Sequence, residues 1–209
     1  MERLRRSQDK GILAGDVIAA LEEEALMAIA VIAFWRRLDV SGRDAARLLE
    51  STTGYELMGQ AVFLDPRGPT ALQYMLDLAP DWSTRQGRIT GFIGQRTIDT
   101  QIVRTPNGWT LNGKNFGMAE VADLDLGFTP ATNLVQLKRV GLPVGNAAKF
   151  DVAWLDAGAD VLVRLPQEYL RTSESDYDYN SPTVDYRATI VLAPSGFAAA
   201  YPGLWEIDH

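Results

Sequence analysis

The sequence predicts a mainly β protein whose strands surround one short helix. From Tyr55 onward, short runs of alternating polar and apolar residues recur at regular spacing with turn residues between them, which is typical of a sandwich, barrel or roll. A single helical pattern at residues 129–141 interrupts these runs and has strand patterns on both sides. We therefore expect the sheet to wrap this helix.

The helical pattern has a clear start and a clear end. Thr129 is a good N-cap, and Pro130 suits the first turn, where its missing N–H is not needed. Lys138 and Arg139 would lie in the last turn, where cations suit the carbonyl end of the helix dipole, and Gly141 ends the pattern. The apolar residues at helical spacing are Leu134, Val135, Leu137 and Val140.

The first part of the chain differs from the rest. Residues 1–26 are predicted to form a helical N-terminal extension, and residues 27–209 a single β domain. The unbroken apolar run Ala25–Trp35 is much shorter than the roughly 20 residues that a membrane-spanning helix needs. Acidic residues precede the run, unlike the positive segment of a secretory signal. We expect a soluble, cytoplasmic protein without a stable membrane span.

Alternation and turn residues predict most of the strands. Periodicity does not decide whether Asp44–Glu50 is a helical turn or a short strand. Asn107-Gly108 is the strongest hairpin signal. The predicted strands are Ala28–Leu38, Tyr55–Phe63, Leu72–Leu78, Trp82–Ile93, Gln95–Arg104, Trp109–Leu111, Asp123–Leu126, Phe150–Trp154, Val161–Leu165, Tyr186–Leu192 and Phe197–Tyr201.

Composition excludes several classes of function. A formal net charge of -7 argues against nucleic-acid binding and against electrostatic docking on anionic lipid, because both need clustered positive charge. The chain has no cysteine, and its one histidine is the terminal His209. Thiolate nucleophiles, zinc-thiolate sites and a Ser-His-Asp triad are therefore not expected. We predict no metal site and no cofactor.

The helical segment resembles a known family. The sequence FTPATN, followed by KRVGL and then Val144-Gly145, is similar to the putative glycolipid-binding proteins of bacteria. The similarity runs from about Trp35 to Trp205 and includes Trp82 and Arg85 (W-x-x-R), Gln167 and Tyr169 (Q-x-Y), and the closing Tyr201–Trp205. The resemblance implies a many-stranded antiparallel sheet, curled as a roll or open barrel around one central helix, and a glycolipid ligand. The family pattern has Pro where this chain has Gln136, so the helix is expected to differ in detail.

Two groups of polar residues are candidates for contact with a ligand. Thr129, Thr132, Asn133 and Arg139 surround the predicted helix and either hold it in place or meet a head group. Gln167, Tyr169 and Arg171 alternate along a strand-like segment and so share one face. An amide, a ring and a guanidinium on one face suit a sugar hydroxyl or a phosphate, although an exposed sheet face gives the same pattern.

Two acidic patterns have competing interpretations. Asp123 and Asp125 lie two residues apart on a strand and could act as an acid and base in glycoside hydrolysis, but they also suit hydrogen bonds to backbone donors at the helix entrance. The run Glu174–Asn180 begins like a calcium loop, but the later Gly and Glu of that loop are missing. We interpret this run as an acidic, aromatic loop or edge strand.

Three functions follow, and we favour the first. It is a binding or carrier protein that holds the apolar tail of a glycolipid or another amphiphile within the curled sheet, with no catalytic residue. The second is a hydrolase of a glycosyl or acyl bond that uses Asp123, Asp125 or Glu168. The third is a structural protein without a ligand site. A homodimer is left open. The candidate ligand-binding residues are Asn133, Arg139, Gln167, Tyr169, Arg171, Trp82 and Arg85.

Overall fold

The structure is a computed structural model that describes residues 28–208, so the predicted helix in residues 1–26 lies outside the described part. The described residues form one sheet of 15 strands with one α-helix and one short 3-10 helix. The strands are β1 (Ala28–Arg37), β2 (Gly42–Ser51), β3 (Gly54–Asp65), β4 (Gly68–Leu78), β5 (Thr84–Ile93), β6 (Arg96–Thr105), β7 (Gly108–Leu111), β8 (Lys114–Asn115), β9 (Leu124–Leu126), β10 (Ala147–Leu155), β11 (Val163–Arg171), β12 (Asp176–Ser181), β13 (Tyr186–Leu192), β14 (Ala198–Tyr201) and β15 (Trp205–Ile207). The helices are α2 (Thr132–Val140) and η1 (Pro182–Val184).

The N-terminal half of the sheet is an antiparallel meander from β1 to β8. Tight turns between strands explain why neighbours in sequence are neighbours in the sheet. β7 and β8 are joined by Asn112 and Gly113, which have φ values of 48° and 81°, as a two-residue hairpin turn requires. The predicted hairpin at Asn107-Gly108 is confirmed, because Thr105 on β6 pairs with Gly108 on β7.

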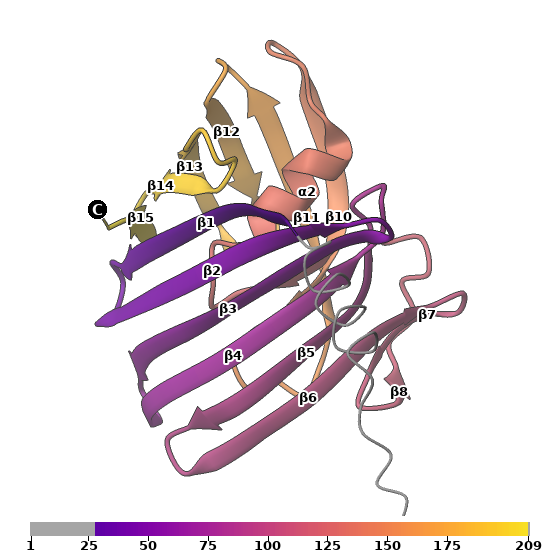
Figure 1. Ribbon diagram of the computed structural model, residues 1–209, viewed down its shortest axis with the longest axis vertical. Helices are drawn as coiled ribbons and strands as arrows, with labels where there is room; N and C mark the ends of the chain where they lie inside the picture. The colour runs from indigo at the N-terminus through magenta and orange to yellow at the C-terminus, as the bar shows by residue number, and fades with distance from the viewer. Residues whose placement is uncertain (1–27, 209) are drawn as a thin grey trace, which may run out of the picture.

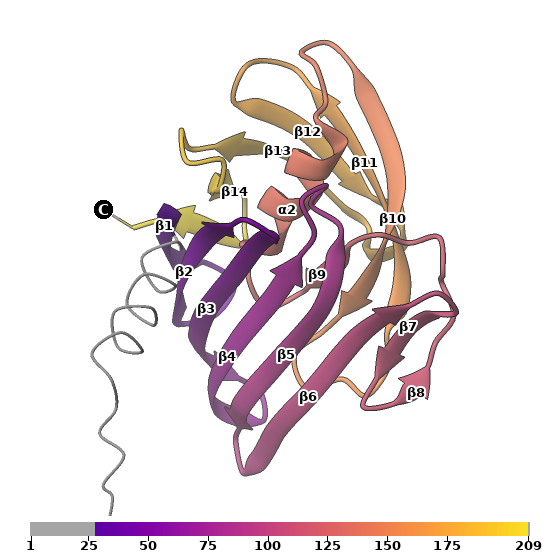
Figure 2. The same ribbon diagram turned by 45° about the vertical axis from the view of Figure 1, so that its right-hand side comes forward.

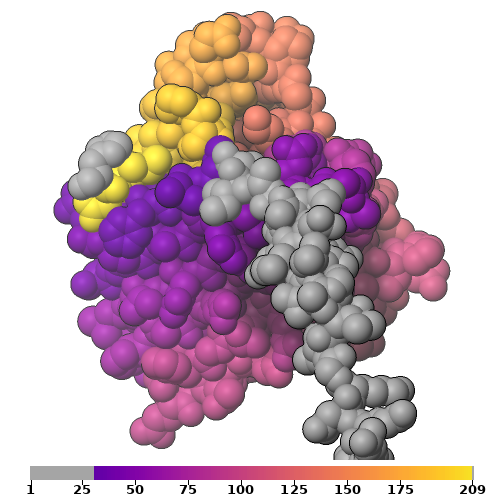
Figure 3. Space-filling view, viewed as in Figure 1, coloured from indigo at the N-terminus to yellow at the C-terminus, as the bar shows by residue number. Residues whose placement is uncertain are grey.

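The C-terminal half continues the sheet on the other side of β1. β15 pairs with β1, and β14, β13, β12, β11 and β10 follow outward in that order. In Figure 1 the two halves stand at an angle to each other. In Figure 3 the yellow C-terminal strands meet the indigo N-terminal strands at the surface. The first and last strands of the described chain, β1 and β15, therefore pair with each other in the middle of the sheet.

Helix α2 connects two strands, β9 and β10, that pair in parallel. β9 and β10 run parallel, and a parallel pair needs a long connection, which α2 provides. Figure 2 shows α2 between the β1–β5 part and the β10–β13 part of the sheet. The first six helical residues, Thr132–Leu137, are all buried. The first part of the helix is therefore buried on every side, and not only along the predicted apolar stripe.

The sheet does not close into a barrel, because β8 and β9 remain its two edges. Instead, the segment leading into β9 lies against the inner face of the first half. The N–H of Thr84 on β5 donates to the carbonyl of Ala122, and the indole of Trp109 donates to the carbonyl of Val121 over 3.0 Å. Leu124 packs over Gly87, where a Cβ would lie 2.8 Å from the Leu124 side chain. The segment at the β9 edge therefore packs against β5 and β7.

Several sequence predictions need correction. The helix begins at Thr132, and Ala131, not Thr129, occupies the N-cap position. The hydroxyl of Thr129 instead accepts a hydrogen bond from the N–H of Ala131, before the helix begins. The run Glu174–Asn180 contributes to β12, which is an interior strand because β11 and β13 flank it. For Asp44–Glu50 the sequence left a helical turn and a short strand open, and the structure shows a strand, β2.

Two further strand predictions are revised. Trp82 lies in the turn before β5 with a φ of 68°, not in the strand. Residues 163–165 of the predicted strand and the segment with Gln167, Tyr169 and Arg171 form one strand, β11, which begins two residues later than predicted.

We expect Gly141→Val to lower the free energy of unfolding by about 1–2 kcal/mol. Gly141 ends α2 with a φ of 57°, as the sequence predicts, and its N–H donates to the carbonyl of Leu137. A Cβ at this position meets no atom within 4 Å, so the cost is backbone strain alone. Equilibrium denaturation measures it, and Gly141→Asn is the control, because Asn tolerates left-handed backbone. Equal losses in both variants would contradict this account.

Candidate functional site

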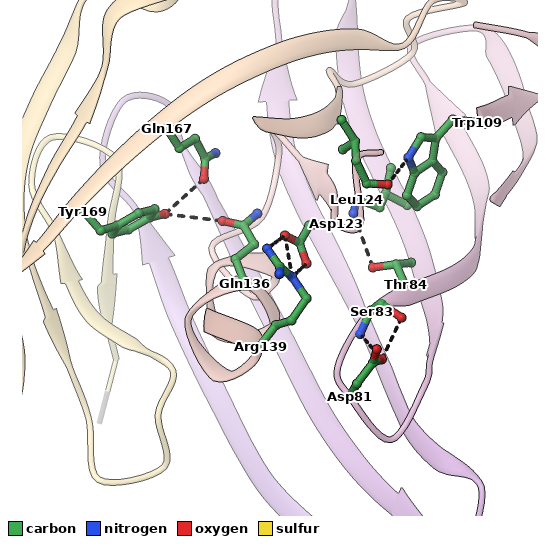
Figure 4. Close-up of polar contacts among 11 residues, drawn as sticks. Asp81, Ser83, Thr84, Trp109, Asp123, Leu124, Gln136, Arg139, Gln167 and Tyr169 are labelled. Carbon is green, nitrogen blue, oxygen red and sulfur yellow. Dashed lines mark hydrogen bonds and ion pairs between the residues drawn. The ribbon is translucent and has the colours of Figure 1, made fainter. Parts of the chain in front are cut away.

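A buried polar network joins the N-terminal half of α2 to β9 and β11. Asp125 accepts the hydroxyl of Thr132 at 2.6 Å and the amide of Gln167 at 2.8 Å. Tyr169 donates to the side-chain oxygens of Gln136 and Gln167, both at 3.3 Å, as Figure 4 shows, and accepts the amide of Asn133 at 3.1 Å. The structure therefore brings together Asn133, Gln167 and Tyr169, three of the predicted site residues.

Two features of this network bear on its electrostatics. Burial raises the pKa of Asp125, and the hydrogen bonds from Thr132 and Gln167 lower it in part. Gln136 is fully buried, and its Nε2 has no hydrogen-bond partner in the described part of the chain.

Arg139 is paired with Asp123. Its Nε and Nη2 donate to the carboxylate over 2.7 Å and 2.6 Å, a two-pronged contact drawn in Figure 4. The side chain of Asp123 is fully buried, whereas that of Arg139 is 26% exposed and lies over the Phe150 ring. The pair ties the end of α2 to the start of β9. The partners of Asp123 and Asp125 are thus side chains and not the backbone donors that the sequence suggested.

A third buried carboxylate, that of Asp44, lies beneath the helix entrance. Asp44 on β2 is fully buried and accepts hydrogen bonds from Tyr74, at 3.0 Å, and from Thr129. The ring of Tyr74 lies across Gly59, where a Cβ would meet the tyrosine hydroxyl at 2.3 Å. Burial raises the pKa of Asp44 to about 6, and the two hydroxyl bonds lower it only in part.

The raised pKa of Asp44 predicts a pH-dependent stability. The pKa of Asp44 in the folded protein, about 6, exceeds the ordinary value of 3.8, so protonation favours the folded state. That contribution is complete below pH 4 and is lost as the pH rises through 6, a change of about 3 kcal/mol. Because Asn does not titrate, the stability of Asp44→Asn relative to the natural chain should rise by about this amount between pH 4 and pH 8. Urea denaturation at both pH values checks it, and a constant difference would contradict it.

A pocket of about 250 Å³ opens beside the network, on the inner face of the C-terminal half of the sheet. We call it the tyrosine pocket. Every strand from β9 to β15 contributes to it, together with the entrance of α2. Its lining residues are Asp125, Leu126, Gly127, Thr129, Asn133, Trp154, Leu165, Tyr179, Val184, Tyr186, Tyr201, Leu204 and Trp205.

Aromatic rings form one side of the tyrosine pocket. Tyr179, Tyr186 and Tyr201 come from three successive strands, and the centroids of each pair of rings lie 5.5–6.0 Å apart. Trp154 lies across Gly127, where a Cβ would be 2.8 Å from the indole. Asp125, Thr129 and Asn133 are each less than 10% exposed and supply polar groups, while the rim includes Val184, which is 49% exposed. Polar groups and aromatic rings in one hollow suit a hydroxylated ring.

The other predicted site residues lie elsewhere. Arg171 donates to the carbonyls of Leu142 and Glu174 and lines a second hollow of about 590 Å³ at the end of α2. We call this hollow the helix-end groove. Its apolar lining residues include Leu134, Leu137, Leu142, Tyr177 and Leu192.

Trp82 and Arg85 support a turn of the sheet. The ring of Trp82 stacks on Tyr55 at 3.9 Å, and Arg85 donates to the carbonyl of Thr53 and pairs with Asp77. Neither residue lines the tyrosine pocket. Their contribution to ligand binding stays a prediction, as does that of Arg139.

Sequence reasoning missed the pocket tyrosines and Asp44. Tyr179 stood in a segment interpreted as a loop or edge, and Tyr201 and Trp205 were noted only as part of the family pattern. The sequence pattern around Asp44 does predict its burial, because Asp44 alternates in step with Ala46 and Leu48 and so lies on the same buried face of β2. A carboxylate in the apolar phase of a strand indicates a buried polar contact.

Comparison with known proteins identifies the family. The family model described as "Putative glycolipid-binding" matches residues 32–206. The chain belongs to this family. A crystal structure of a DUF1089 family protein from Pseudomonas aeruginosa has the same fold, with a TM-score of 0.67 and 23% sequence identity, over 78% of this chain and 91% of that chain. The search of curated proteins finds no match.

The family match covers the part of the chain that forms the sheet. The match spans β1 to β15 and so includes all the residues of the tyrosine pocket. Among residues 28–208, no helix has the length and hydropathy to cross a membrane, and no group of three or more acidic, histidine or cysteine side chains is arranged to hold a metal.

Proposed function

We propose that this protein binds an amphiphile with a sugar head group, and that the tyrosine pocket receives the head. The observation that carries the proposal is the convergence of Asp125 and Asn133 with aromatic rings in one hollow inside the sheet. Polar side chains can hydrogen-bond sugar hydroxyls while rings pack on the apolar faces of the sugar. The family description gives independent support for a glycolipid.

The size of the tyrosine pocket favours a head-first orientation. Its volume of about 250 Å³ is below the roughly 300–1,000 Å³ of pockets for drug-sized ligands, so it suits one sugar ring and not a ring with its tail. The inner face of the first half of the sheet is filled by buried side chains such as Leu57, Leu72 and Leu76. We therefore place the tail at the rim, over Val184 and Leu204, and not within the sheet as the sequence suggested.

A hydrolase finds less support in the geometry. A pair of carboxylates would have to face one cavity about 5–10 Å apart. The tyrosine pocket has one lining carboxylate, Asp125. Asp123 is held by Arg139, and Glu168 binds Lys149 and Asn180. Binding is thus the simpler use of this site.

We expect Asn133→Ala to weaken the binding of octyl glucoside by about 5-fold to 30-fold, because the variant loses one or two hydrogen bonds to the sugar. Titration calorimetry below the micelle concentration measures the affinity, and octanol tests whether the head is needed. Asn146→Ala is the matched control, since Asn146 is exposed and does not line the pocket. Unchanged affinity in folded Asn133→Ala, or equal binding of octanol, would contradict the proposal.

A further inference from the structure

The polar side of the tyrosine pocket offers hydrogen-bond acceptors. The two carboxylate oxygens of Asp125 each accept one bond from the protein, which leaves a lone pair on each. Asn133 uses its amide nitrogen for Tyr169, and within residues 28–208 its Oδ1 accepts no hydrogen bond. The hydroxyl of Thr129 donates to Asp44. At Asp125 and Asn133, therefore, a ligand must supply the hydrogen-bond donors.

Asp125 is the one charged side chain among the described residues that line the pocket, which include no Lys, Arg or His. Two nearby guanidinium groups are already paired: Arg139 with Asp123, and Arg37, which lies against Trp205, with Asp39. An anionic head would meet a carboxylate without a counter-charge, which is unfavourable inside a protein.

The aromatic side of the pocket adds a preference for positive charge. Tyr179, Tyr186 and Tyr201, with Trp154 and Trp205, place five rings around a space that also contains a carboxylate. The faces of such rings attract ammonium groups. Burial raises the pKa of Asp125, and a bound ammonium would favour its ionised form.

We infer that the tyrosine pocket selects its head group by charge, taking an amine-bearing sugar in preference to an uncharged sugar, and an uncharged sugar in preference to an anionic one. This inference rests on the proposed function, because it assumes that the head enters this pocket. It defines the ligand class as a glycolipid whose sugar carries an amino group. Acceptors, rings and the missing counter-charge all favour the same order.

Three octyl glucosides that differ only at carbon 6 test the order directly. One carries CH2NH3+, one the natural CH2OH and one a carboxylate, and their affinities are measured by calorimetry at pH 7. We expect the amine to bind at least about tenfold more tightly than the carboxylate, with the hydroxyl between them. If the carboxylate binds as tightly as the amine, the inference is wrong while the proposed function stands. If none of the three binds, both are wrong.

Two variants at Tyr186 test the cause of the order. Tyr186→Phe keeps a ring and should keep the preference for the amine, whereas Tyr186→Leu should reduce it several-fold and leave the hydroxyl form less affected. Tyr186 is half-buried, which makes both variants compatible with folding. Asp125→Asn, where it folds, should bring the amine and the carboxylate to within about threefold. An amine preference that survives both Tyr186→Leu and Asp125→Asn would contradict the inference.

Discussion

Arg139→Ala is expected to lower the free energy of unfolding by about 3 kcal/mol. The substitution leaves the carboxylate of Asp123 fully buried without its cation, and that desolvated charge dominates the cost. Because the side chain of Arg139 is 26% exposed, water can enter and the loss should fall at the lower end of the range for buried pairs. Urea denaturation at pH 7 measures it.

Two controls distinguish the buried pair from charge in general. Arg88→Ala breaks an ion pair with Asp99 whose side chains are 59% and 64% exposed, and it should cost less than about 1 kcal/mol. The double variant Asp123→Leu, Arg139→Met replaces both partners by apolar groups and should recover most of the loss. A small effect of Arg139→Ala, equal to that of Arg88→Ala, would show that the pair does not tie α2 to β9.

Leu124→Ala is expected to cost about 2–5 kcal/mol, because it opens a cavity where the β9 edge meets the first half of the sheet. Leu124 is fully buried, and its side chain lies over Gly87 of β5. The contact depends on glycine, since an added Cβ would lie 2.8 Å from Leu124. Thermal and urea denaturation both measure the loss.

Gly87→Ala is the test of direct contact. In the natural chain the extra methyl group overpacks the site and should destabilise the fold. In the Leu124→Ala background the same methyl group fills part of the cavity and should stabilise it. An effect of the same sign in both backgrounds would contradict the packing of Leu124 of β9 against Gly87 of β5.

The local features of this fold were predictable because they depend on neighbouring residues. The left-handed Gly141 and the hairpin at Asn107-Gly108 follow from backbone preferences, and both are confirmed. Gln167 and Tyr169 share a face, as alternation requires, and both are buried against the helix. Asn133 reaches them because the sheet wraps the helix that carries it.

The remaining features depend on the order of strands in the sheet, which local patterns do not encode. The tyrosine pocket combines Asp125 of β9 with Tyr201 of β14, although four strands, β10–β13, lie between them in the sheet. Trp82 and Arg85 were grouped with the site because they belong to the family pattern, yet the structure places Trp82 in the turn before β5 and Arg85 near the start of β5, away from the pocket. Periodicity identifies a buried face but not the partner on that face. The cytoplasmic location and the assembly state stay predictions.

The central claim is that a sugar head enters the tyrosine pocket, and a crystal structure of the protein with octyl glucoside tests it most directly. We predict that the sugar ring lies against Tyr179 and Tyr201, with its hydroxyls within hydrogen-bond distance of Asp125 and Asn133 and its alkyl chain passing Val184. Density for the sugar in the helix-end groove or on the outer face of the sheet, with the tyrosine pocket empty, would contradict the account.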